Sequence, residues 1–377
     1  KYLQQPIFTN NFYRFYSQGV ISGVMILKKI INDRWLQLIL LLAAVLRFYN
    51  YSSWSLSNDE LSALVRLQAN GFFDLITHGV RPDFHPAGVE VFLFYWVKLF
   101  GDSAASIRLP FVIAGKFSVL FLYLIAEKWF GKTTAILAAL SLAFLKYTIL
   151  YSQVARPYSP GLLFSLTMVY YWSEIIFSKP SYKQKNFHWG YMISTSLCMY
   201  THYFSFLFAI VVGVTGLFLL KRETAKPYLF SASTAAAFFV PHLSISIEQF
   251  SSGGLGWLGK PEVGYFSKYI SYAFNDSPLL HWIFISFFFA SFIFYFSNIK
   301  LTRHLFICIV WFFIPYLIGY YYSVYINPVL QYSILIFSFP FLLPVIFSFF
   351  KEHRPVVNLT AAIILAAAGL YSTVYEK

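Results

Sequence analysis

The amino-acid sequence predicts an all-α protein that crosses a membrane many times. Hydrophobic residues make up 58% of the chain and charged residues only 11%, far from the balance of a soluble globular domain. Apolar runs long enough to span a bilayer, which takes about 20 residues, recur along nearly the whole chain. Aromatic residues reach 22%, and Tyr and Trp favour membrane interfaces. These observations indicate a polytopic helical membrane protein.

About eleven apolar segments are expected to be transmembrane helices, because each is long and nearly free of charge. They lie at about 35–50, 105–126, 133–150, 160–178, 187–201, 204–220, 228–247, 279–297, 304–322, 329–350 and 356–373. A further apolar stretch at 87–100 is short for a span and carries Glu90 and Lys98. It is expected to be an in-plane interfacial helix of the first outer loop.

Basic residues fix the expected orientation. If residues 87–100 do not cross, the most basic connections all fall on one side, which the positive-inside rule assigns to the cytoplasm. They contain Lys128, Lys132, Lys179, Lys183, Lys185, Lys221, Arg222, Lys226, Lys300, Arg303, Lys351 and Arg354. The net charge of +13 is therefore explained by membrane orientation, and nothing in the sequence indicates nucleic-acid binding. Residues 1–34 are expected to be a cytoplasmic segment and 35–377 the transmembrane domain, with the C-terminus outside.

The outer loops hold most of the residues able to do chemistry. The first runs over 51–104, a short corner follows at 151–158, and a second large loop covers 248–278. The two cysteines, Cys198 and Cys308, lie inside apolar runs and form neither a disulfide framework nor a metal-binding pattern. The first span is expected to act as the insertion signal. Because the sequence begins at Lys1, it is compatible with a fragment of a longer protein.

Adjacent acids in the first outer loop are the most conspicuous polar feature. The chain has only 15 Asp and Glu residues against 28 Lys and Arg residues, yet two of these acids, Asp59 and Glu60, are adjacent in the sequence after the first span. A plain structural interpretation is available, since Ser57 or Asn58 could cap a helix whose first turn favours acidic residues. Other polar groups, however, recur at the outer ends of later segments, and together they form a pattern. They are Arg81 and His85, Arg108, Arg156 and Tyr158, and His202 and Tyr203.

In this order the motifs resemble those of the GT-C superfamily of integral membrane glycosyltransferases, in the branch of protein O-mannosyltransferases and aminoarabinose transferases (families 39 and 83). The resemblance covers roughly residues 35–210 and weakens to topology beyond them. It is carried by Asn58-Asp59-Glu60, then Asp83, His85, Pro86 and Gly88, then Gly101, Arg108 and Pro110, then Ser152, Gln153, Arg156 and Tyr158, and finally His202 and Tyr203. The expected fold is therefore of the GT-C type, with in-plane helices in the first outer loop, which would carry the catalytic residues.

The resemblance implies that a sugar is transferred from a polyprenyl-phosphate carrier to an acceptor glycan, lipid or protein by a single inverting displacement. Asp59 matches the catalytic acid position and would accept the acceptor proton, while Glu60 would orient the acceptor or tune Asp59. The donor phosphate needs cationic or hydrogen-bonding partners, for which the candidates are Arg156, Arg81, His85 and His202. Further candidate substrate contacts are Tyr158, Tyr203, Gln331 and Tyr332. The expected location is a bacterial cytoplasmic membrane, with the active site facing the periplasm.

This chain departs from the family pattern in two places. Relatives often carry Arg-Tyr near the outer end of a late span, where this chain has Gln331 and Tyr332, and many have a second proline where this chain has Ala87. Carboxylates and histidines could bind a divalent cation, but the outer loops hold no second acidic motif, so we favour transfer without a metal or other cofactor. Two other functions fit the composition: a transporter or flippase for lipid-linked sugars, and a non-catalytic membrane subunit with the same fold.

Overall fold

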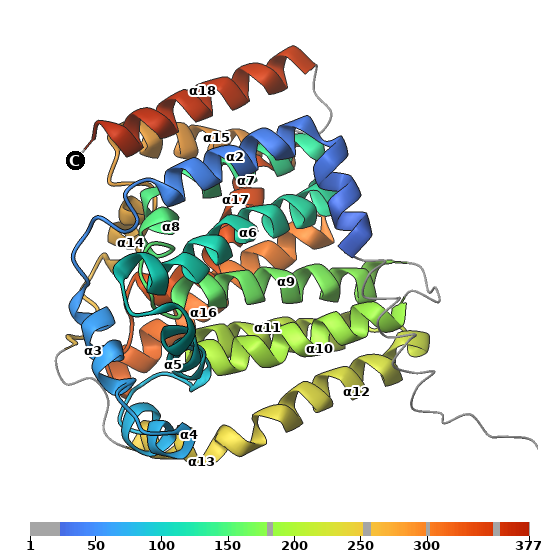
Figure 1. The fold of residues 1–377 in the computed structure, drawn as a ribbon. Coiled ribbons are helices and arrows are strands. Elements are labelled where there is room, and N and C mark those ends of the chain that lie inside the picture. Colours follow the sequence, from blue (N-terminus) through green and yellow to red (C-terminus); the bar gives the residue numbers. More distant parts are fainter. Residues whose placement is uncertain (1–22, 179–183, 252–257, 299–301, 350–354, 377) are drawn as a thin grey trace, which may run out of the picture.

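Long helices running side by side form a bundle, and shorter helices gather at one of its ends (Figure 1). The computed structural model describes residues 23–178, 184–251, 258–298, 302–349 and 355–376. Within these residues the secondary structure is helical and contains no strand. Leu36, Val119, Trp172 and Trp311 are among the buried side chains of the core between the long helices. The all-α prediction is therefore confirmed.

The long helices follow the expected spans closely. They are α2 (Arg34–Phe48), α6 (Ala104–Phe130), α7 (Lys132–Phe144), α9 (Tyr158–Phe177), α10 (Gln184–Thr201), α11 (Tyr203–Leu219), α12 (Arg222–Phe239), α15 (Pro278–Asn298), α16 (Arg303–Tyr325) and α18 (Pro355–Val374). The span expected at 133–150 is divided between α7 and the short α8 (Lys146–Leu150), because the backbone of Leu145 is extended. By length and composition, three helices could each cross a membrane unaided: Ala104–Phe130, the continuous stretch Arg222–Ser251, and Arg303–Tyr325. The expected count of eleven spans is thus not confirmed, although the apolar helices indicate an integral membrane protein.

The segment at 329–350 corrects one expectation, because it is not a single spanning helix. It contains two 3-10 turns, η3 (Ser333–Phe337) and η4 (Phe339–Phe341), followed by the short α17 (Leu342–Phe347). Pro340 and Pro344 lack the amide hydrogen that a continuous helix needs. All residues from 333 to 341 are buried. Irregular backbone of this kind is tolerated at membrane depth where protein surrounds it.

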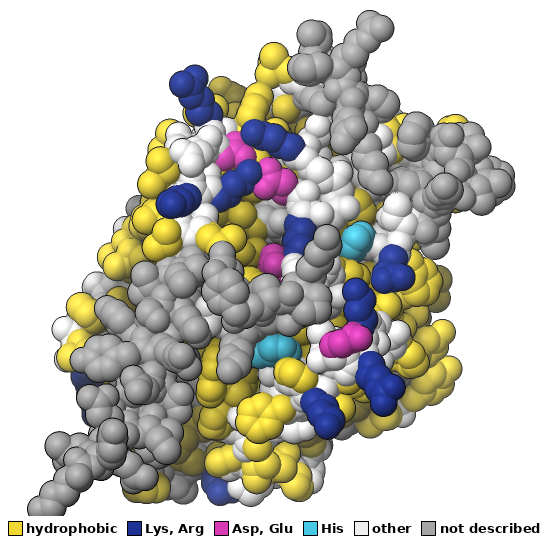
Figure 2. Space-filling view, turned by 90° about the vertical axis from the view of Figure 1, so that its right-hand side faces the viewer, with side chains coloured by type: hydrophobic (Ala, Val, Ile, Leu, Met, Phe, Trp, Pro, Cys, Tyr) yellow, Lys and Arg dark blue, Asp and Glu magenta, His cyan; other side chains and the backbone are white. Residues whose placement is uncertain are grey.

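Basic side chains gather at one end of the bundle. Figure 2 looks onto that end, where Lys and Arg side chains are spread over the surface with fewer acidic ones between them. Two ion pairs join neighbouring elements there: Lys29 Nζ lies 2.6 Å from Glu127 Oε1, and Lys128 Nζ lies 2.8 Å from Glu174 Oε1. The structure thus separates these connections from the loop that carries Asp59, as the charge pattern predicts.

The opposite end carries the first outer loop. Its elements are α3 (Asn58–Arg66), α4 (Phe72–Asp74), the π-helical turn η1 (Leu75–Val80) and α5 (Gly88–Phe100). They gather at the left of Figure 1 with α14 (Tyr265–Ala273) and α13 (Leu243–Ser251), which extends α12 through the turn η2 (Val240–His242). The helix expected at 87–100 is therefore present as α5. A small separate core, which includes Leu75, Leu93 and Phe111, supports this end.

Candidate active site

A cavity of about 470 Å³ opens at this end of the bundle. Its lining combines charged and imidazole side chains from the first outer loop and the following corners with apolar and amide side chains of α16 and the segment after it. Its lining includes Asp59, Ser62, Arg66, Asp83, His85, Arg156, Tyr158, His202, Tyr203, Gln249, Ile318, Tyr322, Asn327 and Gln331. Seven of the sequence-predicted site residues meet here: Asp59, His85, Arg156, Tyr158, His202, Tyr203 and Gln331.

Asp59 reaches the cavity because of how α3 begins. Ser57 caps the helix: its side chain accepts a hydrogen bond from Glu60 N, while Glu60 Oε2 accepts one from Ser57 N at 2.9 Å. This reciprocal pair fixes the first turn. Asp59 lies in that turn, exposed on the cavity side. Its carboxylate is therefore accessible from the cavity.

Glu60 points the other way and is buried. Its Oε1 and Oε2 accept hydrogen bonds from Arg108 Nε and Nη2, each 2.7 Å long, and Oε1 also accepts from Ala155 N at 2.9 Å. Burial acts to raise the pKa of Glu60, but Arg108 and the backbone amides outweigh it and hold the pKa below its ordinary value. Glu60 thus ties the first loop to the corner that carries Arg156.

Arg108 also binds the backbone at the start of the first outer loop. Its guanidinium donates to the carbonyls of Tyr51, Trp54 and Ser55 at 3.0 to 3.1 Å. Such a planar fork suits several fixed acceptors at once. Arg108 and Glu60 therefore act as a buried clasp that sets the position of α3, and with it Asp59.

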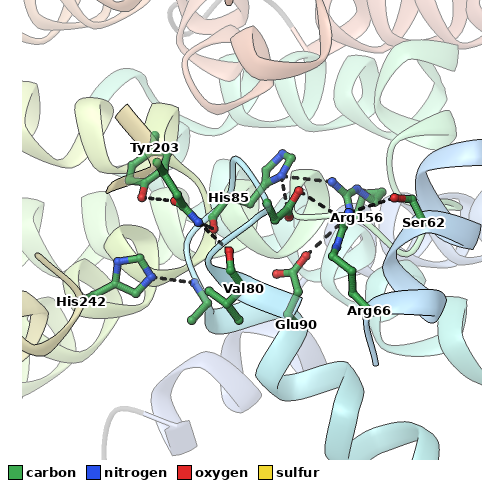
Figure 3. A network of polar contacts seen from close by, with 11 residues as sticks. Ser62, Arg66, Val80, His85, Glu90, Arg156, Tyr203 and His242 are labelled. Atoms are coloured by element: carbon green, nitrogen blue, oxygen red, sulfur yellow. Dashed lines mark hydrogen bonds and ion pairs between the residues drawn. The ribbon is translucent and has the colours of Figure 1, made fainter. Parts of the chain in front are cut away.

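Four residues form a charged wall of the cavity: Arg66, Asp83, His85 and Arg156 (Figure 3). His85 Nδ1 lies 3.1 Å from Arg156 Nη2 and 3.1 Å from Asp83 Oδ2, and Arg66 Nη2 lies 3.3 Å from Asp83 Oδ1. Burial opposes ionisation of Asp83, yet His85, Arg156 and Arg66 keep its pKa below the ordinary value. Asp83 thus remains an anion between the two arginines.

Both histidines of the site are neutral near pH 7. Burial, followed by the positive charge of Arg156, lowers the pKa of His85. Burial lowers the pKa of His202 still further, with His85 and Arg156 adding to the effect. His202 Nδ1 accepts a hydrogen bond from Phe204 N at 3.0 Å and so caps α11. The positive charge of the charged wall therefore belongs to the arginines.

Arg156 is the cation best placed to bind an anion. It is buried, yet it is one of the residues that line the cavity. Within the described parts of the chain its buried Nε and Nη1 atoms have no hydrogen-bond partner, and Nη1 lies 3.7 Å from Glu90 Oε1, beyond hydrogen-bonding distance. The positive charge of the guanidinium is thus not fully engaged by the protein, which suits it to an anionic ligand.

Residues of α13 and of the preceding turn η2 hold the loop that carries His85 in place. Gln249 Nε2 donates to the carbonyls of Val80 and His85, at 2.7 and 3.2 Å, and Gln249 Oε1 accepts from Tyr203 Oη at 2.5 Å. His242 Nε2 accepts from Ala87 N at 3.0 Å (Figure 3). Because the contacts of Gln249 and His242 with this loop connect residues more than 150 positions apart, local spacing in the sequence gave no sign of them.

Three predicted site residues lie away from the cavity lining. Glu60 is engaged in the clasp, and Arg81 forms an ion pair with the exposed Glu248. Tyr332 packs among aromatic rings, with Tyr265 and Tyr272 at centroid distances of 5.0 and 5.1 Å. Arg66, Asp83, Gln249 and Asn327 line the cavity but were not among the predicted site residues. Within the described parts of the chain, no group of three or more His, Cys, Asp or Glu residues is arranged to hold a metal ion.

Comparison with known proteins finds a family model that matches part of this chain. The profile of a family described as dolichyl-phosphate-mannose-protein mannosyltransferase matches residues 84–245. No curated protein sequence matches the chain.

Solved structures share the fold over most of this chain. The crystal structure of ArnT from Cupriavidus metallidurans bound to undecaprenyl phosphate superposes with a TM-score of 0.61 at 15% identity, covering 90% of this chain and 64% of ArnT. The apo state of the same ArnT superposes with a TM-score of 0.56 at 13% identity, covering 87% of this chain and 61% of ArnT. The Archaeoglobus fulgidus oligosaccharyltransferase, in complex with Zn and sulfate, superposes with a TM-score of 0.51 at 12% identity, covering 90% of this chain and 52% of the oligosaccharyltransferase. These proteins are GT-C glycosyltransferases, so the GT-C resemblance expected from the sequence is confirmed at the level of the fold. The chain spans less than two thirds of the length of either ArnT structure.

Proposed function

We propose that this protein is a glycosyltransferase that moves a sugar from a polyprenyl-phosphate carrier to an acceptor on the extracytoplasmic side of the membrane. The observation that carries the proposal is the juxtaposition, in one cavity, of an accessible carboxylate, Asp59, and a partly unpartnered arginine, Arg156. The GT-C fold and the match to a mannosyltransferase profile support the reaction class.

Asp59 would act as the general base. As the acceptor oxygen bonds to the anomeric carbon of the sugar, its proton passes to the Asp59 carboxylate, and the bond between that carbon and the phosphate oxygen breaks. The products are the glycosylated acceptor and polyprenyl phosphate. One displacement of this kind inverts the anomeric configuration and needs no covalent intermediate on the enzyme.

Arg156 would bind the phosphate of the donor and stabilise the charge that develops as it leaves. The guanidinium of Arg156, which lines the cavity, supplies the donors, and the backbone of the corner is held through Ala155 by Glu60. Arg66 is the second cation of the charged wall, but it also pairs with Asp83. Arg81, paired with Glu248 away from the lining, is the weaker candidate for this role.

The polyprenyl tail would lie along α16. A second, nearly apolar cavity of about 450 Å³ is lined by Leu317, Ile318, Tyr321, Tyr322, Tyr325 and Ile326. Ile318 and Tyr322 also line the first cavity, so the two are adjacent. A carrier whose phosphate lies at Arg156 could thus place its apolar chain against α16. Undecaprenyl phosphate is the ligand in one ArnT structure, which supports a carrier of this class.

The cavity lies at the end opposite to the basic connections, which supports an extracytoplasmic active site under the positive-inside rule. For a bacterial protein this corresponds to the periplasmic face of the cytoplasmic membrane. The reaction needs no metal in this scheme, because Arg156 supplies the positive charge.

The test is donor consumption by the purified protein. Wild-type protein is incubated with a panel of radiolabelled polyprenyl-phosphate sugars, with and without a chelator, and both the release of sugar and the anomeric configuration of the product are measured. We expect consumption of at least one donor, inversion at the anomeric carbon, and no effect of the chelator.

Other outcomes separate the alternatives. Movement of an intact lipid-linked sugar across a vesicle membrane without consumption would indicate a flippase. A folded protein that neither binds nor consumes any carrier would indicate a non-catalytic subunit, and either result would overturn the proposal.

A further inference from the structure

Glu90 is an unusual carboxyl group, buried behind the charged wall and without a donor. It lies in the first turn of α5 and is 1% exposed. Among the residues that the structure describes, neither of its oxygens has a hydrogen-bond partner. Its ion-pair contact with Arg156 Nη1 is 3.7 Å long (Figure 3). A carboxylate ion buried in this state is strongly disfavoured, because nothing replaces the water it has lost.

The groups that face Glu90 come from three elements. They are Asp83 in the loop before α5, Arg156 in the corner before α9, and Arg66 at the end of α3. Burial, followed by the negative charge of Asp83, raises the pKa of Glu90 to about 8, and the two arginines oppose this only in part.

Asp83 and Glu90 are two carboxyl groups close enough for their charges to interact, and neighbouring buried carboxylates disfavour each other's ionised form. Asp83 is held as an anion by the ion pair with Arg66, whereas Glu90 has no such close partner within the described residues. The proton of the pair therefore resides on Glu90.

We propose that Glu90 is a positioning residue that stays protonated while the donor phosphate is bound, and that loss of its proton weakens phosphate binding at Arg156. The inference rests on the proposed function. With Glu90 neutral, Asp83 is its anionic neighbour, and the positive charge of Arg156, which lines the cavity, is available to the phosphate. With Glu90 ionised, a second buried carboxylate stands 3.7 Å from that same guanidinium and repels the phosphate.

The first test needs no donor. Infrared difference spectra of wild-type protein, taken between about pH 7 and about pH 9.5, should show the carbonyl stretch of a protonated carboxylic acid disappearing as pH rises. The band should be missing at every pH in Glu90→Gln and unchanged in Glu262→Gln, an exposed control whose carboxylate pairs with Lys268. A wild-type spectrum without this band at the lower pH would overturn the proposal, even if the variants do not fold.

The second test measures the affinity for polyprenyl phosphate. Above about pH 7.5 the phosphate itself is largely ionised, so its charge changes little there. Wild-type and Glu262→Gln affinity should fall above about pH 8, by up to about tenfold per pH unit. In Glu90→Gln, and in the apolar Glu90→Met, binding should be retained and nearly independent of pH.

Each other outcome has one meaning. If both Glu90 variants fold but lose binding at all pH values, Glu90 is an ionised partner of Arg156 and the proposal is wrong. If wild type and Glu90→Gln show the same pH dependence, the proposal is also wrong. If the infrared band is present but wild type binds no carrier at any pH, the protonated state of Glu90 stands and the proposed function fails.

Discussion

Replacing Glu60 by glutamine should destabilise the protein strongly, because it removes the negative charge from the buried clasp. The wild-type carboxylate accepts from Arg108 Nε and Nη2, Ala155 N, Ser57 N and Ser57 Oγ. In either orientation, the glutamine amide would turn an NH₂ group toward at least two of these donors. Arg108 would remain buried without a counter-charge, its side chain being 3% exposed.

The magnitude follows from the geometry. Removing one partner of a buried ion pair typically costs about 3 to 5 kcal/mol, and we expect the free energy of unfolding to fall by this amount. The cost comes mostly from the arginine that is left behind. The double variant Glu60→Gln/Arg108→Met should therefore lose less stability than the sum of its single variants.

The assay is reversible denaturation in mixed micelles, monitored by tryptophan fluorescence. Glu262→Gln is the matched control, since its ion pair with Lys268 is exposed and should contribute nothing measurable. The pKa of Glu60 is below its ordinary value in the folded protein, so this stabilisation is present near neutral pH and is lost as pH falls through that lowered pKa. A Glu60→Gln variant within about 1 kcal/mol of wild type would refute the role of the clasp.

Three further predictions concern the cavity. Arg156→Gln should weaken polyprenyl phosphate binding by about 10- to 100-fold, which is the usual contribution of a charge-assisted hydrogen bond. Arg81→Gln should leave the affinity unchanged in the same binding assay. Equal losses in the two variants would contradict the assignment of Arg156 as the phosphate-binding residue. The pKa of His202 is lowered in the folded state, so the unfolding free energy of wild type should fall as pH drops below about 6.5. His202→Asn, which can still cap α11, should show a shallower decline in pH-dependent denaturation, and an identical slope would argue against the imidazole as its source. Gln331→Arg adds a cation to the cavity lining and should tighten phosphate binding by on the order of tenfold at low salt. The gain in affinity should decrease as the salt concentration increases. Weaker or salt-insensitive binding would show that this side chain does not face the phosphate.

Much of the fold was predictable because hydrophobic length and charge position are local properties. The helix starting at Asn58 and its Ser57 cap follow from the first-turn pattern, and the separation of Lys128 and Lys132 from Asp59 follows from the positive-inside rule. The prediction of a spanning helix at 329–350 was wrong because the apolar composition of this segment is that of a span, although Pro340 and Pro344 interrupt the helix.

The partners within the site could not be predicted, since they depend on contacts between distant residues. The Asp59 position and Arg156 were found from motif order, but the engagement of Glu60 by Arg108, 48 residues away, was not. Arg81 looked like a free cation until the structure placed Glu248 beside it. Glu90 was recognisable in the sequence as a carboxyl group in a short apolar helix, but its proximity to Asp83 depends on the turn between the two residues.

The most direct test of the central claim compares wild type with Asp59→Asn in one titration that follows both carrier binding and sugar transfer. The account predicts that Asp59→Asn binds the donor as wild type does while its turnover falls by about 10²- to 10⁴-fold, because only the proton acceptor has been removed. Undiminished turnover by the variant would contradict the assignment of Asp59 as the catalytic base.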